Sequence, residues 1–234
     1  TRRPPVHATL VLLIIFRTAA FGSVQGLLYI CASIHKIMAD CNEDKIEVHP
    51  FKPFLPQGAR VLMLGTFPPK PERWAMPFFY PNKINDMWRV MGLVFFGDKY
   101  RFIATDGNGY LLADIKQFLQ EKGIAMYDTA EKVIRERDNA SDKYLCIIEP
   151  TDIVAMLASC PTITAVVATG EKAATVAAAQ LGITTPATGC STQAAINNRE
   201  INLYRMPSTS RAYPLALAKK AEAYRAMFHS IGLL

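Results

Sequence analysis

One stretch of the sequence, residues 65–88, combines a stiff backbone with flat side chains. It reads Gly-Thr-Phe-Pro-Pro-Lys-Pro-Glu-Arg-Trp-Ala-Met-Pro-Phe-Phe-Tyr-Pro-Asn-Lys-Ile-Asn-Asp-Met-Trp, with five prolines and several aromatic residues. Because prolines fix the backbone and aromatic rings offer flat faces, the stretch suits a preformed slot for a planar ligand. A proline-stiffened loop packed on the core is the alternative interpretation.

A second stretch, residues 206–214, carries groups that can contact phosphate. It reads Met-Pro-Ser-Thr-Ser-Arg-Ala-Tyr-Pro. Short hydroxyl side chains and backbone N–H groups are common phosphate contacts, and Arg211 adds a positive charge. Tyr213 adds an aromatic ring. The pattern indicates a binding loop.

Each stretch follows an apolar run that reads as a strand. Four such runs end at Gly, Pro or Asp, at residues 60–64, 124–127, 163–168 and 201–206. Helical patterns lie between or after them, at residues 111–119 with Gly123 as C-cap, 153–157 after Asp152, 173–181 before Gly182, and 214–231. Alternating strands and helices predict a three-layer α/β/α fold with a central four-stranded, mostly parallel sheet.

Ligands of such sheets bind outside the carboxyl ends of the strands. The four segments at those ends are polar or rich in Gly and Pro: residues 65–69, 128–129, 169–171 and 207–210. We therefore expect these loops to converge on one rim, which predicts where the site lies but not its chemistry.

Composition argues against a disulfide-stabilised protein and against a metalloprotein. The chain has 234 residues, of which 50% are apolar and 20% charged, which is typical of one globular domain. Its five cysteines are widely spaced, without a C-x-x-C pair, and its four histidines form no ligand-spaced pair. We expect neither a disulfide framework nor a metal site, and reduced thiols favour a cytoplasmic protein.

Residues 1–37 differ from the rest of the chain. They contain four basic residues, no acidic residue, and the apolar run from Leu10 to Phe16. A secretory signal, a membrane span interrupted by Arg17, or translation upstream of a start at Met38 could each explain them, and we favour the last. The predicted domain is therefore 38–234, in which 22 basic and 20 acidic residues leave a net charge of only +2. Any basic footprint must then be local.

In three places the sequence resembles the uracil-DNA glycosylase superfamily. Residues 64–69, Leu-Gly-Thr-Phe-Pro-Pro, resemble its first motif. Phe79-Tyr80 through Asn85-Asp-Met-Trp88 is similar to the Tyr-Tyr…Asn-x-Phe-Trp stretch of the hypoxanthine and mismatch-type branches. Met206-Pro-Ser-Thr-Ser210 matches the Pro-Ser-x-Ser form of the second motif. The resemblance spans about residues 58–230, and the hypoxanthine-glycosylase or bacterial single-strand-selective-like branch is the nearest.

This resemblance implies a DNA repair enzyme that hydrolyses the N-glycosidic bond of uracil, hypoxanthine or xanthine flipped out of DNA. It implies a monofunctional enzyme without metal or cofactor. The sequence carries no signal of oligomeric state, so a monomer is the default expectation. No lysine stands out in the motifs for Schiff-base chemistry.

The resemblance also implies roles for single residues. Asn85 would position the water or the base, or else cap the following helix, and Ser208 or Thr209 replaces the motif histidine that donates to the base. Phe67 replaces a water-holding Asn or Asp and would stack on the base. Base contacts are assigned to Gly65, Thr66, Phe67, Pro68, Phe79 and Tyr80, although Phe79 and Tyr80 could equally belong to the core.

DNA contacts follow from the same comparison. They are assigned to Gly170, Pro207, Thr209, Ser210, Arg211 and Tyr213. The wedge that fills the vacated base stack would be Arg211, Ala212 or Tyr213, and Gly170 would be a tight turn near the DNA backbone, or simply a strand-to-helix turn. Eight cations border these motifs as a predicted phosphate footprint: Lys70, Arg73, Lys83, Arg89, Arg205, Arg211, Lys219 and Lys220.

Two other interpretations remain open. One is a catalytically inactive nucleic-acid- or nucleotide-binding relative, favoured by Phe67 and by the absent motif histidine. The other is a doubly wound protein that binds a small phosphorylated ligand at the strand ends.

Overall fold

The computed structural model describes residues 45–136 and 144–234. From Ile46 to Leu234 the chain forms one compact unit. The segment 1–37 lies outside the described residues, so its separation from the domain stays a prediction. None of the helices in the described ranges is long and apolar enough to cross a membrane.

The central sheet contains the four predicted parallel strands and a fifth that was not predicted. Its order is β3-β2-β6-β8-β7, and its parallel strands are β2 (Val61–Gly65), β3 (Ile124–Asp128), β6 (Ala165–Thr169) and β8 (Arg199–Met206). The edge strand β7 (Ser191–Ile196) pairs antiparallel with β8. Only Ala194 of β7 is buried, so the strand lacks an apolar run. The signal it does carry is the turn Asn197-Asn198, where both residues have positive φ.

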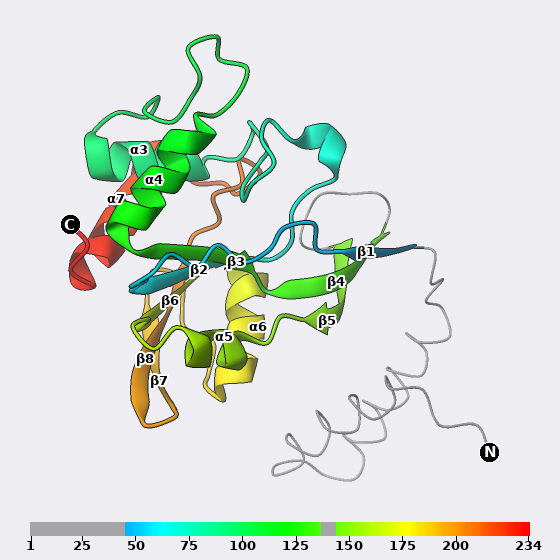
Figure 1. Cartoon of the computed structure of the whole chain (residues 1–234), viewed down its shortest axis with the longest axis vertical. Coiled ribbons are helices and arrows are strands. Elements are labelled where there is room, and N and C mark those ends of the chain that lie inside the picture. The colour runs from blue at the N-terminus through cyan, green and yellow to red at the C-terminus, as the bar shows by residue number, and fades with distance from the viewer. Residues whose placement is uncertain (1–44, 137–143) are drawn as a thin grey trace. The chain divides into compact units, whose positions relative to one another are not determined.

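Helices cover both faces of this sheet (Figure 1). Helices α3 (Met87–Phe96), α4 (Leu112–Lys122) and α7 (Leu217–Ser230) lie on one face, and α5 (Ile153–Ser159) and α6 (Glu171–Leu181) lie on the other. The expected caps are present: Gly123 and Gly182 end α4 and α6 in the left-handed conformation, and the Asp152 side chain accepts the N–H of Ala155. The three-layer α/β/α prediction is confirmed.

A second, antiparallel sheet was missed by the sequence analysis. It has the order β1-β4-β5, formed by β1 (Ile46–Val48), β4 (Ala130–Arg135) and β5 (Leu145–Pro150). These strands carry charged residues among their apolar ones and bury only part of their length, so no continuous apolar run marks them. Strand β4 begins two residues after β3 ends, which places this sheet beside the end of the central one (Figure 1).

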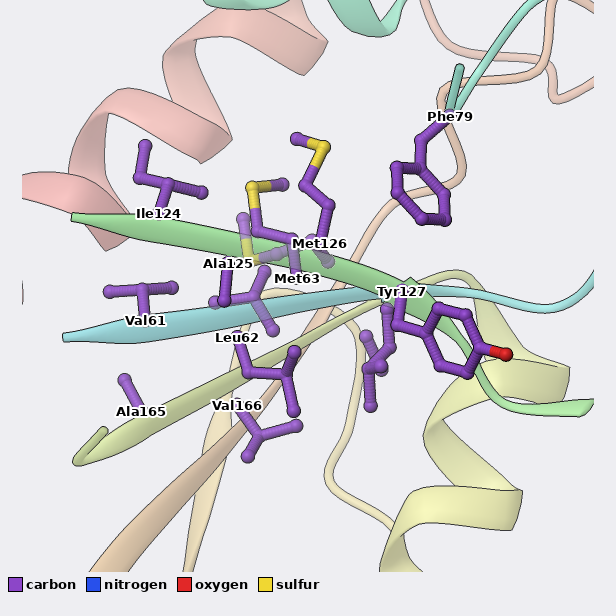
Figure 2. Close-up of a cluster of buried hydrophobic side chains, with 14 of the residues drawn as sticks. Val61, Leu62, Met63, Phe79, Ile124, Ala125, Met126, Tyr127, Ala165 and Val166 are labelled. Atoms are coloured by element: carbon purple, nitrogen blue, oxygen red, sulfur yellow. The ribbon is translucent and has the colours of Figure 1, made fainter. Parts of the chain in front are cut away.

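The core fixes where the strands end. Every residue of β2, β3 and β6 is buried, as expected for parallel strands covered on both faces, and Figure 2 shows their packed side chains. The register places Gly65 opposite Asp128 at the carboxyl ends of β2 and β3. A close approach between these two residues follows directly from the pairing.

Candidate active site

A pocket of about 490 Å³ lies at the carboxyl ends of the parallel strands. It is lined by residues 65–69 after β2, Asp128 at the end of β3, Thr169 at the end of β6, and residues of the segment 208–214 after β8. The wall is completed by Arg73, Tyr80, Pro81, Asn82, Ile84 and Asn85. The predicted convergence of the four strand ends on one rim is therefore confirmed.

The two motif stretches contact each other across this pocket. Asn85 and Ser210 form an isolated antiparallel bridge. The N–H of Asp86 donates to the carbonyl of Thr209 at 2.8 Å. Two segments more than 120 residues apart in the sequence are thus joined by backbone hydrogen bonds at the pocket wall. The proline-rich stretch and the serine-bearing turn therefore face one site.

A buried charge cluster stabilises this junction. Lys220 of α7 is only 1% exposed, and its ammonium donates to Asp86 Oδ2 at 3.0 Å and to the carbonyl of Ser210 at 2.8 Å. Arg211 Nε donates to Asp86 Oδ1 at 3.0 Å. Because a buried carboxylate needs charged or hydrogen-bonding partners, Asp86 links the start of α3 to both the second motif and the last helix.

Asn85 lines the pocket and also contacts the start of α3. Its Oδ1 accepts the N–H of Met87 at 2.9 Å, and the helix cap itself is Asp86. With Oδ1 engaged, the Nδ2 donors are the part of the amide that a ligand can use. Asn85 therefore both stabilises the start of α3 and lines the pocket.

The wall of the pocket contains a carboxylate that was not among the predicted site residues. Asp128 is 6% exposed, and its Oδ2 lies 2.9 Å from His49 Nε2. Since a carboxylate only accepts, the His49 N–H must donate. The other oxygen of the Asp128 carboxylate, Oδ1, lies against Gly65, where an added Cβ would overlap it. The sequence named Asp128 only as part of a strand end, and His49 lies 79 residues away, outside every motif.

His49 sits among aromatic rings that include one from the first motif. Its ring centroid lies 5.3 Å from Phe67, edge to face, and 4.7 Å from Tyr127. Burial raises the pKa of Tyr127, and its hydrogen bond to Glu131 raises it further, so this phenol stays neutral. Phe67 and Asp128 both line the pocket, and His49 contacts both of them without lining it.

The second sheet contacts the first-motif loop, residues 64–69. Arg135 of β4 is buried, pairs with Glu47 of β1 at 2.9 Å, and donates to the carbonyl of Pro68 at 3.0 Å. Its guanidinium lies 6.0 Å from the ring centroid of Phe67. The strands that the sequence analysis missed therefore hold the loop that it identified.

Tyr80 and Phe79, both predicted to wall the pocket, occupy different places. Tyr80 lines the pocket, and its hydroxyl hydrogen-bonds to Thr169 Oγ1 at 2.9 Å. Its φ of 50° is uncommon for a bulky residue, and such conformations cluster at functional sites. Phe79 is 1% exposed and belongs to the core behind the pocket, where its carbonyl accepts from Trp88 Nε1.

The other predicted residues divide in the same way. Those that line the pocket are Gly65, Thr66, Phe67, Pro68, Asn85, Ser208, Thr209, Ser210 and Tyr213. Gly170, Pro207 and Arg211 do not line it. Gly170 is the N-cap of α6, with a φ of 115°, and its N–H donates to the Met206 carbonyl at the end of β8. The Pro207 carbonyl accepts from Tyr224 at 3.0 Å. Gly170 and Pro207 therefore stabilise the chain next to the pocket-lining residues Thr169 and Ser208.

The eight cations of the predicted phosphate footprint have different surroundings in the structure. Lys220 is buried and cannot reach a phosphate, and Arg211, Arg205 and Lys219 form ion pairs with Asp86, Glu171 and Glu222. Three of the predicted cations, the first-loop cations, form no ion pair with a carboxylate in the described part of the chain: Arg73, Lys83 and Arg89. Lys83 instead contacts the Asn108 amide, and Arg89 donates to the carbonyl of Lys83.

Comparison with known proteins gives one informative result. No family model and no curated protein matches the sequence. A solution NMR structure from Methanosarcina acetivorans, provisionally described as a uracil DNA glycosylase, superimposes with a TM-score of 0.54 at 19% identity. The match covers 80% of this chain and 98% of that one. The chain therefore shares the fold of that protein, in agreement with the resemblance of its motifs to the uracil-DNA glycosylase superfamily.

Proposed function

We propose that this protein is a monofunctional DNA glycosylase that hydrolyses the N-glycosidic bond of a deaminated base flipped out of DNA. The observation that carries the proposal is the pocket itself, because both motif stretches line it and join at the bridge between Asn85 and Ser210. The fold shared with the M. acetivorans structure supports the same conclusion.

Asp128 offers a means of recognising deamination. Deamination converts the acceptor nitrogen N3 of cytosine, or N1 of adenine, into an N–H donor. A carboxylate accepts but does not donate, so Asp128 favours the N–H edges of uracil and hypoxanthine over the parent bases. With Oδ2 bound by His49, Oδ1 is the oxygen for this contact. The Phe67 ring can stack on the same base.

Cleavage requires stabilisation of the charges that develop. The bond between C1′ and the base nitrogen breaks, its electron pair remains on the base, and a water oxygen then bonds to C1′ and loses a proton. Donors placed at the base oxygens stabilise the leaving anion. The Asn85 amide N–H groups and the Ser208 hydroxyl, whose oxygen accepts from the Ser210 N–H, are the candidates.

The pocket favours hydrolysis by water over a covalent lysine intermediate. Among the residues that line it within the described ranges there is no lysine, so a Schiff base with the sugar has no nucleophile there. We propose that the enzyme acts as a monomer and without a cofactor.

An inactive DNA-binding relative is the second candidate. It is favoured by Phe67, an apolar residue at the position where relatives hold the water, and by the engagement of Asn85 Oδ1 with Met87. Such a protein would retain damaged DNA without cleaving it.

The test uses labelled oligonucleotides that contain a single uracil, hypoxanthine or xanthine, treated with alkali after incubation to cleave abasic sites. Strand cleavage with wild-type protein, reduced at least about a hundredfold in Asn85→Ala, supports the glycosylase. Retention of damaged DNA without cleavage selects the inactive relative. Neither cleavage nor retention refutes both candidates and leaves a small phosphorylated ligand as the occupant.

A further inference from the structure

An exposed isoleucine stands at the mouth of the pocket. Ile84 lines the pocket and is 56% exposed, although a β-branched apolar side chain is normally turned inward. Single exposed apolar residues are common, so exposure alone indicates nothing. Its position beside Asn85, at the opening of the proposed site, is what calls for an explanation.

The loop that carries Ile84 is held by polar contacts and does not need the side chain as an anchor. The Ile84 N–H donates to Asn82 Oδ1 at 3.0 Å, and the Asn85 N–H donates to the Asn82 carbonyl at 2.9 Å. Arg89 donates to the carbonyl of Lys83 at 3.0 Å. These bonds fix the backbone on both sides of Ile84. A β-branched side chain also has few rotamers to lose when it becomes buried.

A second large side chain lies at the same opening. The antiparallel bridge between Asn85 and Ser210 runs Ile84 alongside the residues that follow Ser210. Among these, Tyr213 is 37% exposed, lines the pocket, and is fixed by the hydrogen bond from its N–H to the Ser210 carbonyl at 3.1 Å. Two rigid loops therefore present one aliphatic and one aromatic side chain at the mouth.

Duplex DNA has a place for such side chains. When a base leaves the stack, the faces of its neighbours become exposed, and proteins that distort DNA fill such gaps with apolar residues, including Ile. Two of the first-loop cations, Lys83 and Arg89, lie on either side of Ile84 in the sequence, where they can contact the phosphates next to the gap. A protein partner would give no reason for an exposed isoleucine to lie at the opening of the pocket.

We propose that Ile84 is a wedge that enters the duplex from the first-motif side and fills the stack vacated by the flipped base, with Tyr213 packing from the facing turn. The proposal rests on the proposed function. It adds a residue outside the second motif, the stretch in which the sequence placed the wedge.

The experiment compares duplex with single-stranded substrate. Single-turnover excision of uracil is measured for wild type, Ile84→Ala and Ile84→Leu, with Ile148→Ala on the exposed face of β5 as a matched control for loss of the same side chain. Ile84→Ala is expected to slow excision from the duplex about tenfold and to leave excision from single strands unchanged, because a single strand has no gap to fill. Ile84→Leu and Ile148→Ala should behave as wild type.

A second readout does not depend on chemistry. 2-Aminopurine placed next to the damaged base in the duplex gains fluorescence when its neighbour unstacks, and the rise on binding should be smaller with Ile84→Ala. Equal slowing on duplex and single strand, or an unchanged fluorescence rise, overturns the wedge. If wild type excises nothing, the proposed function fails. The fluorescence then decides the wedge alone: a rise that depends on Ile84 supports it, and any other result refutes it.

Discussion

Replacing Asp128 by asparagine tests whether the pocket reads an N–H edge. His49 Nε2–H needs an acceptor and lies 2.9 Å from Oδ2, so it would hold the amide oxygen at that position. The amide nitrogen would then take the place of Oδ1 in the pocket and direct a donor at the donor of the base. The substitution therefore reverses the polarity of one contact while keeping its shape.

The magnitude follows from two contributions. A hydrogen bond to a charged group contributes about 1.5–3 kcal/mol, and two facing donors leave at least one of them unsatisfied, at about 1–3 kcal/mol. Together they predict a loss of roughly 3–5 kcal/mol in transition-state binding, or about 10²–10⁴ in the single-turnover rate on uracil or hypoxanthine. Glu149→Gln, which removes a carboxylate paired with Lys132 at the surface, is the control and should leave the rate unchanged.

A double substitution makes the test specific to His49. In His49→Phe the ring still packs among its aromatic neighbours but has no N–H to fix the amide. In the His49→Phe/Asp128→Asn double variant the amide can turn its oxygen to the base, so excision should recover at least about tenfold over Asp128→Asn alone. Wild-type excision by Asp128→Asn, or a double variant no faster than the single one in protein that melts cooperatively, would refute the reasoning.

Three further predictions concern the same region. Gly65→Ala places a Cβ against Asp128 Oδ1 and should lower excision at least about a hundredfold. Gly109→Ala is the control, because its Cβ would meet nothing closer than 3.8 Å, and it should excise as wild type. Equal rates for the two variants would contradict the close packing of Gly65 against Asp128. Lys220→Met leaves the buried Asp86 without its ammonium partner and should reduce the free energy of unfolding, measured in urea, by about 3–5 kcal/mol, and a loss below about 1 kcal/mol would contradict this. Binding to DNA is followed by anisotropy between 50 and 200 mM salt. We expect a logarithmic slope of about −3, because the three first-loop cations have, among the described residues, no carboxylate partner that competes with phosphate; a slope near −7 would support the footprint of eight cations.

The sequence predicts the central sheet well because its strands are buried on both faces. A strand of this kind, such as β2 (Val61–Gly65), must be a continuous apolar run, and a Gly, Pro or Asp at its end or directly after it marks where it stops. Parallel strands share one direction, so their ends meet at one edge. The location of the site therefore follows from local patterns alone, as does the position of helix caps such as Gly123.

The direction in which a side chain points is much harder to predict from sequence than the location of the site. Phe79 and Tyr80 are adjacent and similar, yet one is buried in the core and the other lines the pocket, because the backbone turns through positive φ at Tyr80. Lys219 and Lys220 differ in the same way, since one faces solvent and the other a buried carboxylate. A pattern of residue types does not contain these distinctions, which depend on contacts with distant segments.

The largest omission, the second sheet, shows why the site could not be completed from its motifs. A motif contains the residues that touch a ligand, but other residues hold these in place. Arg135 donates to the Pro68 carbonyl, and His49 contacts both Phe67 and Asp128. These supporting residues lie in or directly after short, partly charged strands, which carry no strong pattern of their own. If His49 sets which oxygen of Asp128 faces the base, specificity depends on a residue that no motif contains. Changes at His49, directly after β1, should then alter base selection while every motif residue stays the same.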